Sequence, residues 1–185
     1  MLHNKPISYD ERGIKLMKIK LNFFKTFFLL IVLLSFLFSF GCTQKETHIE
    51  GFLKYVYSFE YKSNSDFFEE INSSKDFQEL SILLDEKYEY METFCTKECI
   101  DRLKSNRQPI SLWQFLNDNN LDMNVNDITI KKKSDTSFDF SVNVDIRKNN
   151  EIIYSSVQKG QIILDEYKKI DNVYFQNLNN IFEIN

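Results

Sequence analysis

The chain has 185 residues, with 23 basic against 27 acidic side chains and a formal net charge of −4. An acidic chain has no electrostatic reason to bind nucleic acid, so we expect no nucleic-acid partner. Only four glycines and two histidines are present. A phosphate-binding loop needs clustered glycines, and no Walker or dinucleotide-binding motif occurs. His48 is the single histidine beyond residue 41, which excludes metal centres with two histidine ligands within one such chain.

The first segment, residues 1–16, suits neither a signal sequence nor a folded element. It contains two acidic side chains, a proline and a glycine. Met17 is followed by Lys-Ile-Lys, a typical start for an export signal. We therefore expect translation to begin at Met17 and regard residues 1–16 as a non-native upstream extension.

A basic stretch, an apolar stretch and a small residue follow in the order of an export signal. Lys18 to Lys25 carries three positive charges and no acid, and Phe27 to Phe40 is apolar except for two serines. As a helix, the apolar stretch would span about 21 Å, short of the ~30 Å hydrocarbon core of a bilayer. A cleaved signal is therefore favoured over an uncleaved transmembrane helix.

Gly41 and Cys42 end this stretch, and residues 17–41 resemble a bacterial lipoprotein signal peptide. In that class the cysteine is acylated and becomes the first mature residue. The pattern departs at Ser39 and Phe40, where a leucine and a small residue are usual. The resemblance implies a lipid anchor at Cys42 on the extracytoplasmic face of the cell membrane. A plain signal peptide and an uncleaved anchor are the alternatives.

The remainder of the chain has the length of one domain. Residues 1–41 hold six Lys/Arg and two Asp/Glu, which leaves 17 basic and 25 acidic side chains, a net charge of −8, in residues 42–185. A chain of this length can bury roughly two-thirds of its unfolded surface. We assign residues 42–48, with His48, to a tether and residues 49–185 to a single domain.

The first half of this domain has helical periodicity. Apolar residues three or four apart predict a first helix that ends near residue 64: Ile49, Phe52, Leu53, Val56 and Phe59. Further helices are predicted over residues 66–71, 75–92 and 97–105, and from Ser111 onward. The expected N-caps are Ser73 or Ser74, Thr96 and Ser111, because their hydroxyls can accept from the first free backbone N–H groups.

From about residue 124 the period changes to two. Apolar and polar residues alternate from Phe138 to Arg147, which predicts a strand with one buried face. Asn149-Asn150 suits a tight hairpin turn, because asparagine tolerates positive φ. Further strands are expected over residues 151–164, with a bulge or bend at Gly160, and over residues 168–175. Helices followed by an antiparallel meander predict an α+β domain with the helices on one sheet face.

Two short motifs carry a resemblance to the nuclear-transport-factor-2-like, or cystatin-like, superfamily. They are Phe94-Cys95-Thr96-Lys97-Glu98-Cys99-Ile100 and Tyr167-Lys168-Lys169-Ile170-Asp171-Asn172-Val173, within residues 49–173. Small lipoproteins of low-GC Gram-positive bacteria show similar steps, with tryptophan where this chain has Tyr167. The resemblance implies N-terminal helices packed on a curved antiparallel meander, which together form a cone.

The mouth of that cone can hold a ligand or an active site. Enzymes of the superfamily, such as ketosteroid isomerase and scytalone dehydratase, use an Asp base or an Asp–His arrangement inside it. Strand alternation places Asp139 and Asp145 on the polar face instead, and Asp165 lies at the end of an apolar run. We therefore predict no catalytic residue, no metal site and no cofactor.

Cys95 and Cys99 flank the expected start of a helix. A helix N-terminus lowers a thiol pKa, and a loop-to-first-turn pair can reach the Cα separation that a disulfide needs. An exported compartment permits such a bridge. A disulfide, two free structural thiols and a redox function are the alternatives.

These observations predict a lipid-anchored extracytoplasmic binding or assembly module of the cell envelope, not an enzyme. The expected partners are the membrane, an envelope protein and a second copy bound through the sheet face. A small-molecule carrier that uses the cone cavity and an isomerase- or dehydratase-type enzyme are the alternative functions.

Overall fold

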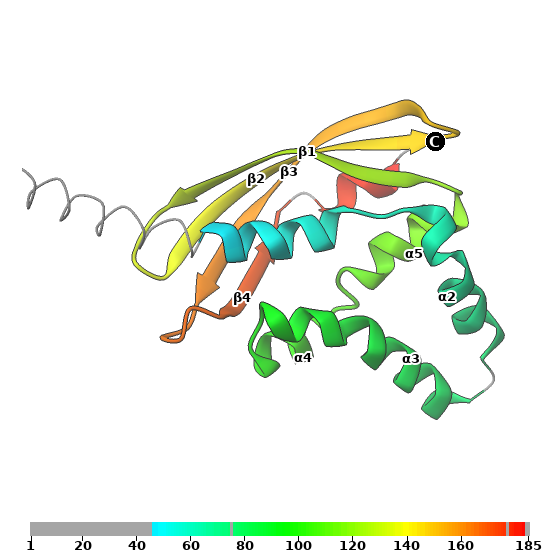
Figure 1. The fold of residues 1–185 in the computed structure, drawn as a ribbon, viewed down its shortest axis with the longest axis horizontal. Coiled ribbons are helices and arrows are strands. Elements are labelled where there is room, and N and C mark those ends of the chain that lie inside the picture. The colour runs from blue at the N-terminus through cyan, green and yellow to red at the C-terminus, as the bar shows by residue number, and fades with distance from the viewer. Residues whose placement is uncertain (1–45, 75, 177, 184–185) are drawn as a thin grey trace, which may run out of the picture. The chain divides into compact units, whose positions relative to one another are not determined.

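The computed structural model describes residues 46–74, 76–176 and 178–183, which form an α+β domain (Figure 1). Residues 46–57 are helical. The helices that follow are α2 (Tyr61–Ser73), α3 (Phe77–Glu89), the 3₁₀ helix η1 (Tyr90–Thr93), α4 (Lys97–Ser105) and α5 (Ile110–Asp118). The strands are β1 (Asp122–Lys132), β2 (Ser137–Lys148), β3 (Glu151–Leu164) and β4 (Ile170–Phe175), and the 3₁₀ helix η2 (Leu178–Glu183) follows. The predicted lipidation site, Cys42, lies outside the described residues.

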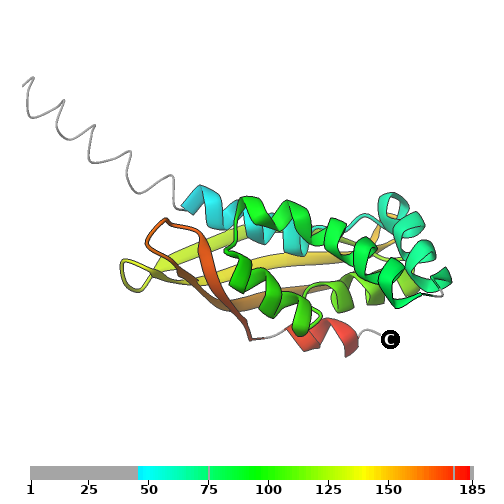
Figure 2. The same ribbon diagram turned by 90° about the horizontal axis from the view of Figure 1, so that it is seen from below.

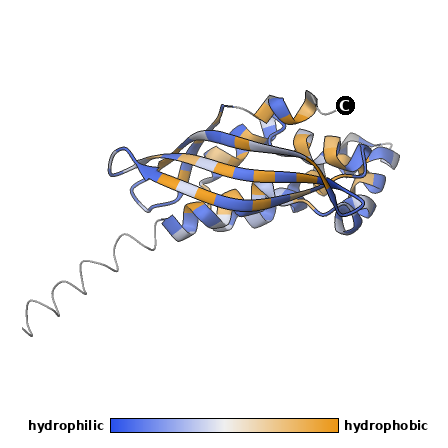
Figure 3. Cartoon of the chain, turned by 90° about the horizontal axis from the view of Figure 1, so that it is seen from above, coloured by the Kyte–Doolittle hydropathy of each residue, from blue (hydrophilic) through white to orange (hydrophobic). Residues whose placement is uncertain are grey.

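The four strands form one antiparallel sheet in the order β1-β2-β3-β4, so each strand pairs with its neighbour in the chain. The helices lie against one face of this sheet, and no other element of the described ranges covers the opposite face, which is called the open face below (Figures 2 and 3). The predicted turn between β2 and β3 is confirmed, because Asn149 and Asn150 adopt φ values of 52° and 69°. The predicted α+β class is likewise confirmed.

The core lies between the sheet and the helices. Colouring by hydropathy shows the alternation along the strands (Figure 3). The apolar set of β2 is buried on the helix side: Phe138, Phe140, Val142, Val144 and Ile146. The helix over residues 46–57 contributes Ile49, Phe52, Leu53 and Val56, all fully buried. The indole N–H of Trp113 in α5 donates to the Val56 carbonyl at 2.9 Å, which joins two helices inside this core.

The prediction that the first helix continues to about residue 64 is wrong. The helix ends at residue 57, and Phe59 forms an isolated antiparallel bridge with Met123 in β1. The two residues exchange backbone hydrogen bonds of 2.8 and 2.7 Å. Phe59 is therefore buried through strand pairing, although its spacing is helical. The serines at 63 and 65 lie inside α2 instead of ending a helix.

Two predicted N-caps are also wrong. The cap of α3 is Asp76, whose side chain accepts from the Gln78 N–H at 3.0 Å, instead of Ser73 or Ser74. Helix α5 begins at Ile110, and the Ser111 hydroxyl donates to the Arg107 carbonyl. A hydroxyl used as a donor inside a helix satisfies no free N–H group of the first turn. Helix α4 and its cap Thr96, in contrast, are confirmed.

His48 belongs to the folded domain and not to a tether. Its Nε2 donates to the Phe94 carbonyl at 3.0 Å, and the two rings lie 5.3 Å apart. Residues 46–48 are therefore part of the helix that precedes the core.

Gly160 also differs from expectation, because the strand register is regular there. The register shifts lie between Ile146 and Arg147 and between Ile163 and Leu164. A glycine is present at 160 because the neighbouring backbone and an aromatic ring approach it closely.

Candidate functional site

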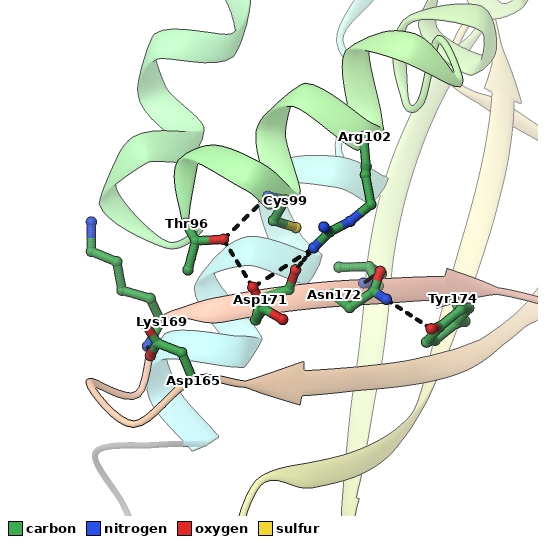
Figure 4. A network of polar contacts seen from close by, with 9 residues as sticks. Thr96, Cys99, Arg102, Asp165, Lys169, Asp171, Asn172 and Tyr174 are labelled. Carbon is green, nitrogen blue, oxygen red and sulfur yellow. Dashed lines mark hydrogen bonds and ion pairs between the residues drawn. The ribbon is translucent and has the colours of Figure 1, made fainter.

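Helix α4 and strand β4 lie side by side, and Asp171 joins them (Figure 4). The Thr96 hydroxyl accepts from the Cys99 N–H at 3.1 Å and donates to Asp171 Oδ1 at 3.3 Å. One turn along α4, the Arg102 guanidinium donates to the Asp171 carbonyl and lies 3.7 Å from its carboxylate. Two residues of the helix therefore contact one residue of the strand.

The turn before β4 is held by its own polar contacts. The Asp165 carboxylate accepts from the Lys169 N–H at 2.7 Å, and the Lys169 ammonium donates to the Glu92 carbonyl at 2.9 Å. Lys168 adopts a positive φ of 67°. These contacts fix where β4 begins. Asp165 therefore has a structural partner in this turn and is not among the residues that line the grooves described below.

The first part of the outer edge of β4 is covered by the segment before α4. The Ile170 N–H donates to the Phe94 carbonyl at 2.9 Å, and the Ile170 carbonyl accepts from the Thr96 N–H at 2.9 Å. Cys95 and Ile170 thus form a parallel bridge. Past Asp171 this cover ends, because α4 turns the chain away from the strand.

A groove of about 420 Å³ lies between α4 and the rest of β4. Its wall on the helix side is formed by Cys99, Arg102, Leu103 and Asn106, with Gln108 beyond the helix end, and its wall on the strand side by Asn172, Val173, Tyr174 and Phe175. Along the strand, the Asn172 carboxamide accepts from the Val173 N–H at 3.0 Å and donates to the Tyr174 hydroxyl at 2.7 Å. Uncharged side chains therefore prevail on the strand side of the groove.

Cys95 and Cys99 are both buried, free thiols at this site. Interaction with the Cys95 thiol, aided by the Arg102 charge, lowers the pKa of Cys99, and burial opposes this shift. Interaction with Cys99, together with burial, raises the pKa of Cys95. The disulfide between the two residues stays a prediction.

The other predicted acidic residues lie away from this groove. Asp139 and Asp145 lie on the sheet face opposite the buried apolar set of β2, as expected from the alternation, but Asp145 is itself buried, with 7% of its surface exposed. Asp145 accepts from the Ser155 hydroxyl at 2.6 Å. Hydrogen bonds from Ser155 and Asn126 lower the pKa of Asp145, which favours its ionised form and does not suit a general base with a raised pKa.

Two further hollows lie on the helical side of the domain. An apolar groove of about 180 Å³ lies between α3 and α4, with Leu80, Leu84 and Tyr88 in its lining and the Lys104–Asp85 ion pair of 2.6 Å at its rim. A hollow of about 480 Å³ is lined by charged side chains of three helices, Asp85, Glu86 and Glu89 of α3, Glu92 of η1 and Lys104 of α4, together with Ile82, Tyr88 and Ile100. Within the described ranges, no three His, Cys, Asp or Glu side chains are grouped to hold a metal ion. None of the helices in the described part is long and apolar enough to cross a membrane.

Sequence reasoning identified Thr96 and the two thiols but missed Arg102, Asn172 and Tyr174. One signal was present in the sequence. The period of two fails at Asp171-Asn172, where two polar residues lie in succession between Ile170 and Val173. This failure marks the register shift that turns the Asp171 carbonyl toward Arg102.

We compared the chain with protein families, with curated proteins and with solved structures, and none of the three comparisons gave a match. The site is therefore interpreted from its own geometry.

Proposed function

We propose that the protein is a lipid-anchored, extracytoplasmic binding module of the cell envelope. The anchor is Cys42, which follows a basic and then an apolar stretch that ends in glycine. Lipid attachment supplies about 0.8 kcal/mol of membrane affinity per buried CH₂, and more than one chain makes the attachment stable. The fold that this proposal assumes is the nuclear-transport-factor-2-like type, with helices on one face of the meander.

The groove between α4 and β4 is the observation that supports binding. It combines a volume of about 420 Å³ with polar groups of several kinds on both walls. The described acidic residues discussed above either have structural partners or lie on the open sheet face. A binding role therefore needs fewer assumptions than catalysis.

A carrier that uses the inside of the cone is less well supported. Rings from the helix over residues 46–57 and from two strands meet there. Tyr57 lies 6.5 Å from Phe140 and 6.2 Å from Phe175, and Phe140 lies 6.2 Å from Phe175. Because these rings pack against each other, binding at the outer groove is the better-supported alternative.

The intact mass of the protein extracted from membranes with detergent tests the anchor. We expect residues 42–185 plus a diacylglyceryl group for the wild type and for Thr43→Ser, a neighbouring control. Cys42→Ser should lose both the lipid and the cut. A cut but unlipidated wild type, or an uncut one, contradicts the proposal.

The binding role is tested by a photo-crosslinking residue placed at Asn106, which lines the groove, in the membrane-bound full chain. The same residue at Ser105, one position along α4 and outside the groove lining, is the control. We expect a specific adduct from position 106 alone. Equal adducts from both positions, or none from either, contradict binding in this groove.

A further inference from the structure

The direction of each backbone group on β4 follows from its pairing with β3. Phe175 lies opposite Gly160, and the Gln176 N–H donates to the Lys159 carbonyl at 2.8 Å. In an antiparallel ladder this arrangement makes Phe175–Gly160 a pair without mutual hydrogen bonds. Two residues earlier, Val173 occupies the same kind of position opposite Ile162. The backbone groups of Val173 and Phe175 therefore point away from β3, toward the groove.

Most of these groups have no partner among the described residues. The backbone hydrogen bonds of this edge involve Ile170, and the Asp171 carbonyl accepts from Arg102. The Val173 N–H donates only to the side chain of the preceding Asn172. The Val173 carbonyl and both backbone groups of Phe175 make no hydrogen bond within the described part of the chain. A strand edge with free groups is a template for another strand.

The opposite edge of the sheet, formed by β1, is protected against pairing with another strand. Strand β1 has a register shift between Val125 and Asp127 and is paired at Met123 by Phe59. It ends in Lys131 and Lys132, with Lys133 next. Bulges, lysines and covering segments are the devices that keep edges from pairing. The open part of β4, Val173 to Phe175, carries no charged side chain and no register shift, and α4 stands beside it at the width of the groove.

We propose that an extended polypeptide segment binds as an added strand on the open edge of β4, in the groove beside α4. This inference rests on the proposed binding function and names the class of partner. Addition of a strand to a sheet edge is a general mode of peptide recognition, in which the main chain supplies affinity and alternate side chains supply specificity. The segment offers a carbonyl to the Phe175 N–H and N–H groups to the two free carbonyls. It also replaces the Asn172 side chain as the partner of the Val173 N–H.

The walls of the groove specify what this strand carries. Its side chains alternate, so every second one lies against α4, where Leu103 is buried and Cys99 lies one turn away. The intervening side chains lie beside Asn172 and Tyr174, which is half exposed. We therefore expect apolar residues at every second position and polar residues between them. Because α4 stands along the edge, the space accepts one strand between helix and sheet.

Selection from a displayed library of random ten-residue peptides tests the proposal on the detergent-solubilised full chain. Peptides are selected on the wild type after depletion on Asn106→Trp, which places an indole in the groove from an exposed position. The enriched peptide is then synthesised and titrated. We expect Asn106→Trp to weaken its binding by about tenfold or more, because the strand and its hydrogen bonds are excluded. Ser105→Trp, the matched control, should bind like the wild type.

The site of binding is read from backbone amides. The Phe175 amide proton should exchange rapidly in the free protein and be protected when the peptide is bound. The Tyr174 amide, which faces β3, should be protected in both states. Intermolecular contacts should connect the peptide backbone to Val173 and Phe175.

Each other result overturns the inference. Peptides that leave the Phe175 amide unprotected bind elsewhere. Self-association that Asn106→Trp abolishes shows that a second copy of the chain occupies the edge. If position 106 crosslinks to a partner but no peptide binds to β4, the proposed binding function stands and an extended peptide is not its ligand. No crosslink and no peptide remove both.

Discussion

Gly160 lies opposite Phe140 across the β2–β3 pair, so close that a Cβ on residue 160 would lie 2.4 Å from the Phe140 ring. The same Cβ would lie 2.2 Å from the Tyr174 carbonyl oxygen of β4. Three strands therefore approach each other at one residue that has no side chain. The backbone of β4 cannot move away without breaking its ladder to β3.

Gly160→Ala should therefore destabilise the domain by about 3 kcal/mol, the upper end of the usual cost of overpacking. Gly51→Ala is the matched control. Its Cβ would meet the edge of the Phe94 ring at 2.8 Å, and a ring edge can turn aside. Chemical denaturation measures both free energies of unfolding. An equal loss in the two variants would mean that the strands separate easily at residue 160.

Removal of the Tyr57 hydroxyl and removal of the Tyr88 hydroxyl should have opposite effects on the free energy of unfolding. The Tyr57 hydroxyl is buried without a hydrogen-bond partner, whereas the Tyr88 hydroxyl donates to the Gln108 carbonyl at 2.8 Å. Removal of an unsatisfied buried group is neutral or stabilising by about 1 kcal/mol, and removal of a satisfied one costs about 1 kcal/mol. Tyr57→Phe should therefore keep or raise the free energy of unfolding, and Tyr88→Phe should lower it. A loss in Tyr57→Phe would indicate a bound water at its hydroxyl.

Stability should fall in alkaline solution. Burial raises the pKa of Tyr57 and Tyr88 well above 10, and raises that of Tyr55, with help from Tyr90, to about 12. The unfolded chain loses these protons near pH 10, while the folded protein keeps them, so the unfolded state binds fewer protons. The contribution of these tyrosines to the free energy of unfolding is fully present below pH 10. It declines as the pH rises toward 12, by about 1.4 kcal/mol per pH unit for each fully buried tyrosine.

Denaturation at pH 9, 10 and 11, with tyrosinate absorbance recorded in parallel, checks this decline. Tyr57→Phe should make the decline shallower. Because exposed tyrosines such as Tyr167 also contribute to this absorbance, the wild type is compared with Tyr57→Phe, and an identical decline in the two would contradict the burial of the Tyr57 hydroxyl.

Thr96, which caps α4, and Ser111, which lies inside the first turn of α5, form a third contrast. Thr96 accepts from the Cys99 N–H and also contacts Asp171, so Thr96→Ala should cost about 1–2 kcal/mol. Ser111→Ala should change stability by less than about 0.5 kcal/mol, because its hydroxyl only donates to the Arg107 carbonyl inside the helical turn. Urea denaturation of both variants measures this difference. Equal losses would contradict the assignment of Thr96 as the cap.

We expect Cys95 and Cys99 to form a disulfide when the protein is oxidised. A low-molecular-weight disulfide takes two electrons from Cys95 and Cys99, so that one internal S–S bond forms and two small thiols leave. The peptide that holds both residues should become lighter by roughly 2 Da and resist alkylation. Peptide mapping before and after reduction checks it, and Cys99→Ala should abolish the mass change. Two alkylated cysteines after oxidation would exclude the bridge.

Local features of the fold could be predicted from sequence. The limits of α4 and its Thr96 cap, the Asn149-Asn150 turn and the span of β3 depend on neighbouring residues and match the structure. The strand-like pairing of Phe59 could not be predicted, because Phe59 has the spacing of a helical residue and its partner Met123 is distant in the chain. Ser111 could not be distinguished from a cap, because the chain before it already turns through Pro109.

The candidate groove depends on contacts between distant parts of the chain. Arg102 and Asp171 are 69 residues apart, and no local pattern pairs them. The open edge of β4 depends on which backbone groups face β3, and this follows only from the register. The two thiols were visible in sequence, but the opposite directions of their pKa shifts depend on the folded start of α4.

The order of helices before strands determines which parts of the domain are the first to be without their packing partners. A chain grows from its N-terminus, so the helix over residues 46–57 leaves the ribosome before the strands that cover it. The Val56 carbonyl can accept its hydrogen bond from Trp113 only after 57 further residues have emerged. Phe59 can form its bridge only after Met123 has emerged. Until these contacts form, the apolar side chains of the helix over residues 46–57 are exposed to solvent. Holdase chaperones recognise exposed apolar surface of this kind. Chains that end before β2 should therefore be bound by chaperones on the side of the membrane where the domain folds, and complete chains should not.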